Sequence, residues 1–262
     1  MEQHRVDIIN VAGLLRTERH NGIEDAVLHR FQPHSFTTIA PTPPLLAAED
    51  PERSIERAIG MVDEIIARLT RENPAGNPPD VILFGHSYGA FIALLVACRM
   101  RFQNIMRIIL DEGPLNPDVE VKPPPLFPPL AACYQHYRER PRLGREAVST
   151  LRGLGTSRVL IVQGTREDSV VPNASQVLPG DYRKVQLQSG ADTAWTDSAD
   201  PSGGLILQLP ADIGGVPRGI KNPFPDSYST HLLWSREKMD AITFIIEQEA
   251  RALARSSVNR AA

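Results

Sequence analysis

Short apolar runs alternate along the chain with longer segments in which apolar residues recur every three or four positions. The longer segments have the spacing of amphipathic helices, and the short runs have the length and composition of buried strands. Strands that alternate with helices are typical of a mostly parallel sheet covered on both faces. The strand-like runs are residues 6–11, 36–40, 81–84, 105–111, 158–163 and the less apolar, edge-type run 182–187. The pattern therefore predicts an α/β fold with a mostly parallel central sheet of about six strands and helices on both faces.

The predicted helices carry recognisable start signals. Residues 21–24 form a capping box that opens a helix ending near Phe31. Asp50 and Pro51 are an N-cap and a first-turn proline, and the helix behind them has one apolar stripe: Ile55, Ile59, Val62, Ile66 and Leu69. A closing helix is expected over residues 235–254, with one apolar face made of Met239, Ile242, Ile246 and Ala250.

One stretch carries a specific chemical signal. The strand at residues 81–84 leads into Gly85-His86-Ser87-Tyr88-Gly89, and an apolar helical run follows. A serine on so sharp a turn must take a strained backbone conformation, and glycines on both sides avoid collisions where strand and helix nearly touch. This is the G-x-S-x-G nucleophile elbow in its strand-turn-helix context. The chain resembles the α/β-hydrolase superfamily.

The resemblance implies a catalytic triad in the chain order serine, acid, histidine. Ser87 matches the nucleophile, and His231 matches the base because it follows the elbow and precedes the closing helix. Asp168 lies in a loop similar to the family's G-x-x-D-x-x-V-P segment and matches the acid. Asp111, at the end of the preceding strand, is the alternative acid. The resemblance also implies an oxyanion hole formed by the backbone N–H groups of Tyr88 and Leu14.

The substrate side of the site is less determined. A lid-like insertion is expected over residues 113–155, with a proline-rich part and a short helix near residues 131–137. The alternative is a surface loop without substrate contact. His136, inside this insertion, is expected to be exposed or to face the substrate. The candidate substrate-binding residues are His86, Leu126, Phe127, Leu130, Tyr134 and Trp234.

The expected domain organisation is a single α/β-hydrolase domain over residues 1–262 that lacks the family's N-terminal hairpin. A second insertion, residues 189–229, separates the last edge-type strand from His231. Its segment Gly204 to Leu209 has the composition of an extra strand or hairpin. Residues 255–262 are expected to form a disordered tail.

The composition of the chain limits the classes of molecule that the protein is expected to bind. A net charge of −3 offers no basic field for nucleic acid, and the chain shows no signal peptide or membrane span, so a cytoplasmic location is the expectation. The two cysteines have no metal-site spacing and are expected to be reduced core residues. No metal and no cofactor are expected.

The predicted function is a serine hydrolase that cleaves a carboxylic ester, thioester or lactone of a small molecule. The same fold and triad could instead perform acyl transfer, cyclisation or lyase chemistry, and a third alternative is a non-catalytic ligand-binding protein. The sequence leaves the oligomeric state open.

Overall fold

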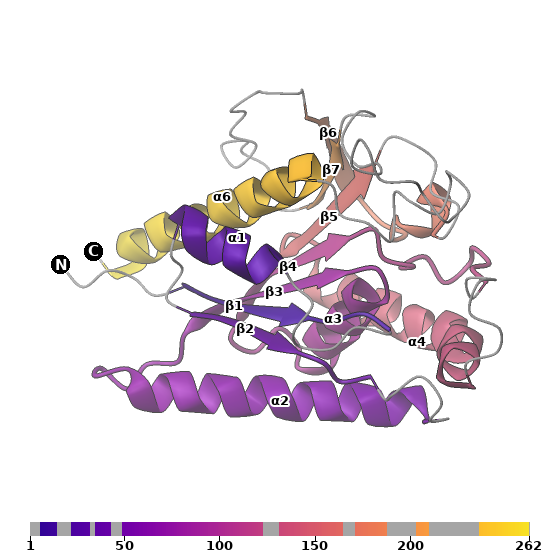
Figure 1. The fold of residues 1–262 in the computed structure, drawn as a ribbon, viewed down its shortest axis with the longest axis horizontal. Coiled ribbons are helices and arrows are strands. Elements are labelled where there is room, and N and C mark those ends of the chain that lie inside the picture. The colour runs from indigo at the N-terminus through magenta and orange to yellow at the C-terminus, as the bar shows by residue number, and fades with distance from the viewer. Residues whose placement is uncertain are drawn as a thin grey trace.

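The sheet is the centre of the molecule (Figure 1). The computed structural model describes residues 6–14, 22–31, 35–42, 49–122, 131–164, 171–187, 203–209 and 236–261. Within these residues seven strands form one sheet in the order β2-β1-β3-β4-β5-β7-β6, and all neighbouring strands are parallel. The strands are β1 Val6–Val11, β2 Ser35–Ile39, β3 Asp80–His86, β4 Ile105–Asp111, β5 Val159–Gly164, β6 Tyr182–Gln186 and β7 Gly204–Leu209. The predicted α/β fold is confirmed.

Helices cover both faces of this sheet, as Figure 1 shows. The helices are α1 Gly22–Phe31, α2 Pro51–Glu72, α3 Tyr88–Arg99, α4 Ala131–Leu154 and α6 Arg236–Ala261. One core cluster joins side chains of α2, α3 and α4 to the sheet, and a second joins α1 and α6 to its other face. Because side chains alternate along a strand, Leu83 of β3 faces the first cluster, whereas Ile82 and Phe84 face the second. His86 continues the α6-facing row.

Helix α2 begins where the sequence predicted. The Asp50 side chain accepts a hydrogen bond of 3.0 Å from the Glu52 backbone N–H, and Pro51 occupies the first helical position. Of the predicted stripe, Ile55, Val62, Ile66 and Leu69 are buried, and Ile59 is partly buried against the same cluster. The cap and the stripe together place α2 along the sheet.

The sheet differs from the prediction by one strand. The segment from Gly204 to Leu209 is β7, and it lies between β5 and β6 rather than forming a hairpin beside them. The count of about six is therefore one too low. In the described part of the sheet, strand β6 lies at the edge, as its polar composition predicted.

Two helices are longer than predicted. Helix α4 spans 24 residues instead of the short helix expected near residues 131–137, and it continues through Pro141. Buried Arg140, Leu143 and Ala147 hold both sides of this proline against the protein. Helix α6 continues to Ala261, so the predicted end at Ala254 was wrong. No helix among the described residues is long and apolar enough to cross a membrane.

The two cysteines are buried and unpaired, as predicted. Cys98 lies in α3, where burial raises the pKa of its thiol to about 12. Burial also raises the pKa of Cys133 in α4. Neither thiol has the lowered pKa of a reactive nucleophile.

Candidate active site

Ser87 sits on the tight turn between β3 and α3. Its backbone has φ 56° and ψ −132°, a left-handed conformation that a non-glycine residue adopts only at a cost of about 1–3 kcal/mol. The turn leaves no room for side chains on either side of it. A Cβ on Gly85 would lie 2.5 Å from the Gly89 carbonyl oxygen, and one on Gly89 would lie 2.2 Å from the Val11 carbonyl oxygen. The glycine requirement inferred from the motif is therefore met by real contacts.

Neighbouring backbone fixes the turn further. The Ser87 N–H donates a hydrogen bond of 2.9 Å to the Asp111 carbonyl oxygen, which joins the elbow to the end of β4. Ser87 is partly exposed, whereas His86 and Tyr88 on either side are buried. Solvent therefore reaches the serine but not the residues on either side of it, as expected for a nucleophile elbow.

The loop after β1 lies against this turn. A Cβ on Gly13 would lie 3.8 Å from the Tyr88 amide nitrogen and 3.4 Å from the Gly89 amide nitrogen. Leu14, the next residue, is half-buried and packs on the core cluster of α2, α3 and α4. The Ala12 N–H donates 2.9 Å to the Ile39 carbonyl oxygen and so ties the loop to the end of β2. The loop that carries Leu14 and the first amide of α3 are therefore neighbours.

Four charged or polar side chains lie buried beside the elbow, on the α6 face of the sheet. His86 pairs with Asp111 in the register of β3 and β4, and its Nδ1 lies 2.6 Å from Asp111 Oδ2. Lys238, in the first turn of α6, places its Nζ 3.3 Å from Asp111 Oδ2 and 2.7 Å from Glu112 Oε2. Glu112 has φ 46°, so the chain bends sharply where β4 ends. We call His86, Asp111, Glu112 and Lys238 the elbow cluster.

The electrostatics of the elbow cluster depend on Lys238. Burial alone would lower the pKa of its ammonium group, but the carboxylates of Asp111 and Glu112 outweigh burial, and its pKa is raised. Lys238 therefore stays charged. His86, Asp111 and Glu112 bring ligand atoms within 4.8 Å of one another, a spacing that suits a metal ion, yet the ammonium already supplies their positive charge.

The side chain of Tyr88 points away from the elbow cluster and anchors α3 to α4. It is buried, its hydroxyl donates 3.1 Å to the His136 carbonyl oxygen, and its ring meets the His136 ring edge-on at 5.1 Å. Burial raises the pKa of Tyr88 well above its usual value. His136 is 1% exposed, so the expectation of an exposed histidine was wrong. Its ring fills the junction between α4, Tyr88 and Ser54.

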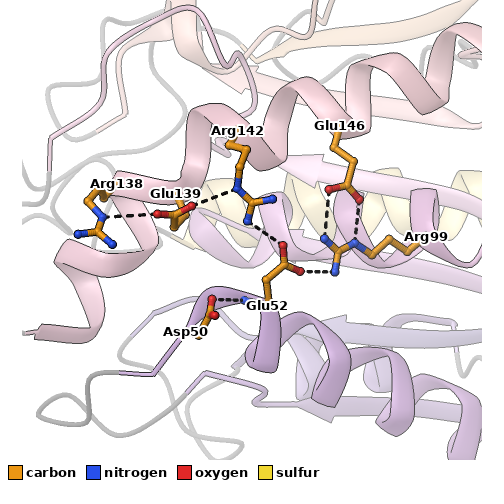
Figure 2. Close-up of polar contacts among 7 residues, drawn as sticks. All are labelled: Asp50, Glu52, Arg99, Arg138, Glu139, Arg142 and Glu146. Atoms are coloured by element: carbon orange, nitrogen blue, oxygen red, sulfur yellow. Dashed lines mark hydrogen bonds and ion pairs between the residues drawn. The ribbon is translucent and has the colours of Figure 1, made fainter.

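Ion pairs fasten α4 to α2 and α3 on the surface. Figure 2 shows Glu52 between two arginines, with Arg99 at 2.6 Å and Arg142 at 2.7 Å. Arg99 also pairs with Glu146 of α4 at 2.9 Å, and Arg142 pairs with Glu139 at 3.1 Å. This network raises the pKa of Arg142 and lowers that of Glu52, because the paired charges favour one another. The helical half of the predicted lid is thus held in place.

Several predicted site residues lie outside the described residues: Leu126, Phe127, Leu130, Asp168, His231 and Trp234. Tyr134 is described and is 56% exposed on the first turns of α4. His86, predicted as a substrate-binding residue, is instead 6% exposed and faces Asp111. The described part of the site therefore comprises Ser87, Tyr88, Leu14 and the elbow cluster.

Sequence reasoning missed Lys238 and Glu112. Of the predicted stripe on α6, Ile242, Ile246 and Ala250 are buried and Met239 is half-buried, and the buried face begins one residue earlier, at Lys238. A lysine four residues before a buried isoleucine is the signal that could have identified it, since a buried lysine needs a carboxylate partner. The acidic pair that ends β4 is that partner.

The chain is similar in sequence to a known family of proteins and in fold to solved structures. A family model described as "Alpha/beta hydrolase family" matches residues 21–260. No curated protein sequence matches. Among solved structures, an S-formylglutathione hydrolase from Agrobacterium tumefaciens is 13% identical with a TM-score of 0.51, over 96% of this chain and 86% of that one. Est1E from Butyrivibrio proteoclasticus is 14% identical with a TM-score of 0.49, over 95% of this chain and 90% of that one. TT1662 from Thermus thermophilus is 15% identical with a TM-score of 0.47, over 94% of this chain and 90% of that one.

Proposed function

The chain belongs to the alpha/beta hydrolase family, and from this premise we propose that it is a serine hydrolase with Ser87 as its nucleophile. At the level of the family it is a hydrolase. The proposed reaction is the cleavage of a carboxylic ester, thioester or lactone of a small molecule, through an acyl-enzyme intermediate and without a cofactor. The observation that carries the proposal is the environment of Ser87: its backbone is strained and the residue is partly exposed. On either side of it, at Gly85 and Gly89, any added side chain would collide with backbone atoms.

In the proposed reaction, the Ser87 hydroxyl attacks the carbonyl carbon while His231 accepts its proton. The tetrahedral intermediate then collapses, and the leaving group departs with the proton that His231 returns. Water, activated by the same histidine, hydrolyses the acyl-serine ester and restores Ser87. His231 suits this role because it follows the elbow in sequence and lies five residues before α6 begins at Arg236.

The oxyanion hole would be formed by the backbone N–H groups of Tyr88 and Leu14. Tyr88 begins α3, where N–H groups are not used by the helix itself. The close approach of Gly13 to the Tyr88 amide supports the second donor, because Leu14 is the next residue on that loop. Removing one such donor typically costs about 3 kcal/mol of transition-state stabilisation.

For the acid we propose Asp168, with Asp111 as the alternative. The contacts of Asp111 support this choice. Its Oδ2 is already within 2.6 Å of His86 Nδ1 and 3.3 Å of Lys238 Nζ, and the whole residue is buried. A carboxylate engaged in this way is better suited to holding the elbow than to orienting the imidazole of the base.

Replacement of Ser87 tests the proposal. The Ser87→Ala protein should keep its fold and its thermal unfolding profile but lose turnover of p-nitrophenyl acetate and of a panel of acyl esters, thioesters and lactones. A fluorophosphonate probe should label the native protein, with the adduct found by mass spectrometry on the Ser87 peptide. An alanine variant that retains full activity on its best ester would refute the proposal.

Acyl transfer is separated from hydrolysis in the same assay. Adding an alcohol or amine nucleophile should leave the acid as the main product if water is the natural acceptor. A transferred acyl group as the main product would assign the site to acyltransferase chemistry. A native protein that neither labels nor turns over any substrate would indicate a ligand-binding role.

A further inference from the structure

The elbow cluster holds the nucleophile turn through two separate connections to Asp111. The Asp111 carbonyl oxygen accepts the Ser87 N–H at 2.9 Å, and its carboxylate contacts His86 Nδ1 at 2.6 Å. Two consecutive residues of the elbow are therefore fixed by one residue of β4. Asp111 is in turn held by Lys238 of α6, so the position of the elbow depends on a helix that covers the face of the sheet opposite α3.

We propose that Lys238 is a positioning residue for the reaction at Ser87: it holds the Asp111 and Glu112 carboxylates so that Asp111 can fix His86 and Ser87 in the elbow. The inference rests on the proposed function. Lys238 is 1% exposed, and its ammonium contacts the carboxylates of Asp111 and Glu112. Its effect passes through Asp111 to the backbone that presents the serine hydroxyl.

Charge explains why the lysine is needed. Asp111 and Glu112 are adjacent, both are less than a tenth exposed, and both turn a carboxylate toward the same ammonium. Without that ammonium the two carboxylates would repel each other in a poorly solvated site, or one of them would take up a proton. Either change would alter the contact between Asp111 and His86. Glu112 has a left-handed backbone, with φ 46°, and its carboxylate lies 2.7 Å from Lys238 Nζ.

The location of Lys238 gives this contact a second consequence. It lies in the first turn of α6, seven residues after His231, the proposed base. The ion pairs thereby fix the start of α6 to the end of β4, at the edge of the sheet where the elbow lies. The ion pairs of Lys238 that hold the nucleophile turn therefore also fix the position of the first turn of α6, which follows His231 in the sequence.

The test uses a charge-balanced double variant, Lys238→Met with Glu112→Gln. This pair removes one charge of each sign, so the net charge of the elbow cluster is unchanged, and it leaves the Asp111 carboxylate in contact with His86 but without its ammonium partner. The matched control is Arg107→Met with Glu249→Gln, which removes an ion pair of 2.6 Å between the same two elements, β4 and α6. Glu249 lies eleven residues along α6 from Lys238, about 16 Å by the helical rise. The control therefore loosens α6 far from the elbow.

Two measurements are made on the full chain. The first is the second-order rate constant for labelling of Ser87 by a fluorophosphonate probe between pH 5 and 9. The second is hydrogen exchange of the Ser87 amide, whose acceptor is the Asp111 carbonyl oxygen. The cluster variant should label at least about tenfold more slowly at the pH plateau and should exchange this amide at least about tenfold faster. The midpoint of its pH profile should stay within about 0.3 units of the native value, because the net charge near the base is unchanged. The control should match the native protein in both measurements.

The Asp111→Asn variant is carried in parallel, because it keeps the side-chain volume and leaves Lys238 balanced by Glu112. It should also label more slowly, and its midpoint should fall by less than about one unit, because the loss of one nearby negative charge alone lowers the pKa of the base only modestly. A midpoint lowered by a unit or more in this variant would show that Asp111 orients the base itself, and would overturn the positioning role. If the double variant does not fold, the Asp111→Asn result decides between the two roles.

The outcomes separate this proposal from the proposed function. A cluster variant that labels at the native rate overturns the positioning role and leaves the serine hydrolase intact. If the native protein does not label at all, the proposed function fails, and amide exchange alone decides whether Lys238 holds the elbow. Exchange at the native rate would then overturn the proposal as well.

Discussion

At Gly89 the lack of a side chain is a packing requirement. A Cβ there would lie 2.2 Å from the Val11 carbonyl oxygen and 2.9 Å from backbone atoms of Ala12 and Gly13. These are backbone atoms of the loop that carries Leu14, and they cannot rotate away as a flexible side chain would. The glycine therefore sets the distance between the start of α3 and the end of β1, and with it the separation of the two proposed oxyanion donors.

This geometry predicts opposite effects for two glycine-to-alanine changes. Gly89→Ala should lower the free energy of unfolding by about 3 kcal/mol, because backbone must move to admit the methyl group. Gly60→Ala should raise it by about 0.5–1 kcal/mol, because Gly60 is exposed in the middle of α2 and nothing lies within 4 Å of the added carbon. Urea unfolding of both variants measures the difference. Equal effects would contradict the close approach at Gly89.

Among the helices, α4 shows what the sequence could and could not predict. Its first residues were predicted as a short helix near residues 131–137, but the helix continues to Leu154 through Pro141, although proline removes a backbone donor from the helix. The helix continues because side chains on both sides of the proline are buried against α3 and the loop after β4. That packing comes from residues distant in sequence, so local spacing alone could not have predicted it.

The buried guanidinium of Arg140 is the strongest of these connections. Arg140 donates to the carbonyl oxygens of Pro114 at 3.2 Å and Asn116 at 2.6 Å, and to that of Val119. Arg140 is 1% exposed, so its guanidinium is buried where it donates to these three carbonyl groups. One side chain thereby shapes the first part of the predicted lid insertion.

Replacing this arginine should therefore cost stability. We expect Arg140→Met to lower the free energy of unfolding by about 3 kcal/mol, because buried carbonyl groups lose their donors. Hydrogen exchange in residues 114–119 should accelerate. The control is Arg138→Met on the same helix, whose side chain is 71% exposed and whose loss should change stability by less than about 0.5 kcal/mol. Similar losses in both variants would mean that the three backbone contacts of Arg140 contribute little.

At the scale of the whole molecule, the sequence predicted the helices and strands better than it predicted the order of the strands in the sheet. Alternation of strands and helices was enough for the α/β fold, and the G-x-S-x-G motif was enough to locate the turn at Ser87. The insertion of β7 between β5 and β6 was not predictable, because an apolar run such as residues 204–209 has the same pattern in a hairpin and in a buried parallel strand. The contact of Lys238 with Asp111 and Glu112 was missed for a related reason. Lys238 and Asp111 meet only once α6 is placed against β4.

Burial of His136 should make the stability of the protein fall in acid. Burial lowers the pKa of this histidine from 6.5 to about 4, and the nearby Glu49 and Asp50 offset the effect only in part. Between these two pH values the unfolded chain binds a proton that the folded protein does not. Stability is therefore full above about pH 6.5 and falls as the pH drops toward 4, by about 3 kcal/mol in total from this residue.

Turnover should fall over part of the same range for a separate reason, since protonated His231 cannot accept the Ser87 proton. The two causes can be separated with His136→Phe, whose ring can keep the edge-on contact with Tyr88. Its free energy of unfolding, measured in urea at intervals from pH 7 to 4, should decline less steeply than that of the native protein. Exposed His29, changed to Gln, is the control and should leave the native slope unchanged.

The acid limb of ester turnover should persist in the His136 variant, because its base is intact. A rate profile that is flat from pH 5 to 8 would argue against His231 as the base, whereas an unchanged stability slope in the His136 variant would exclude His136 as the source of acid sensitivity.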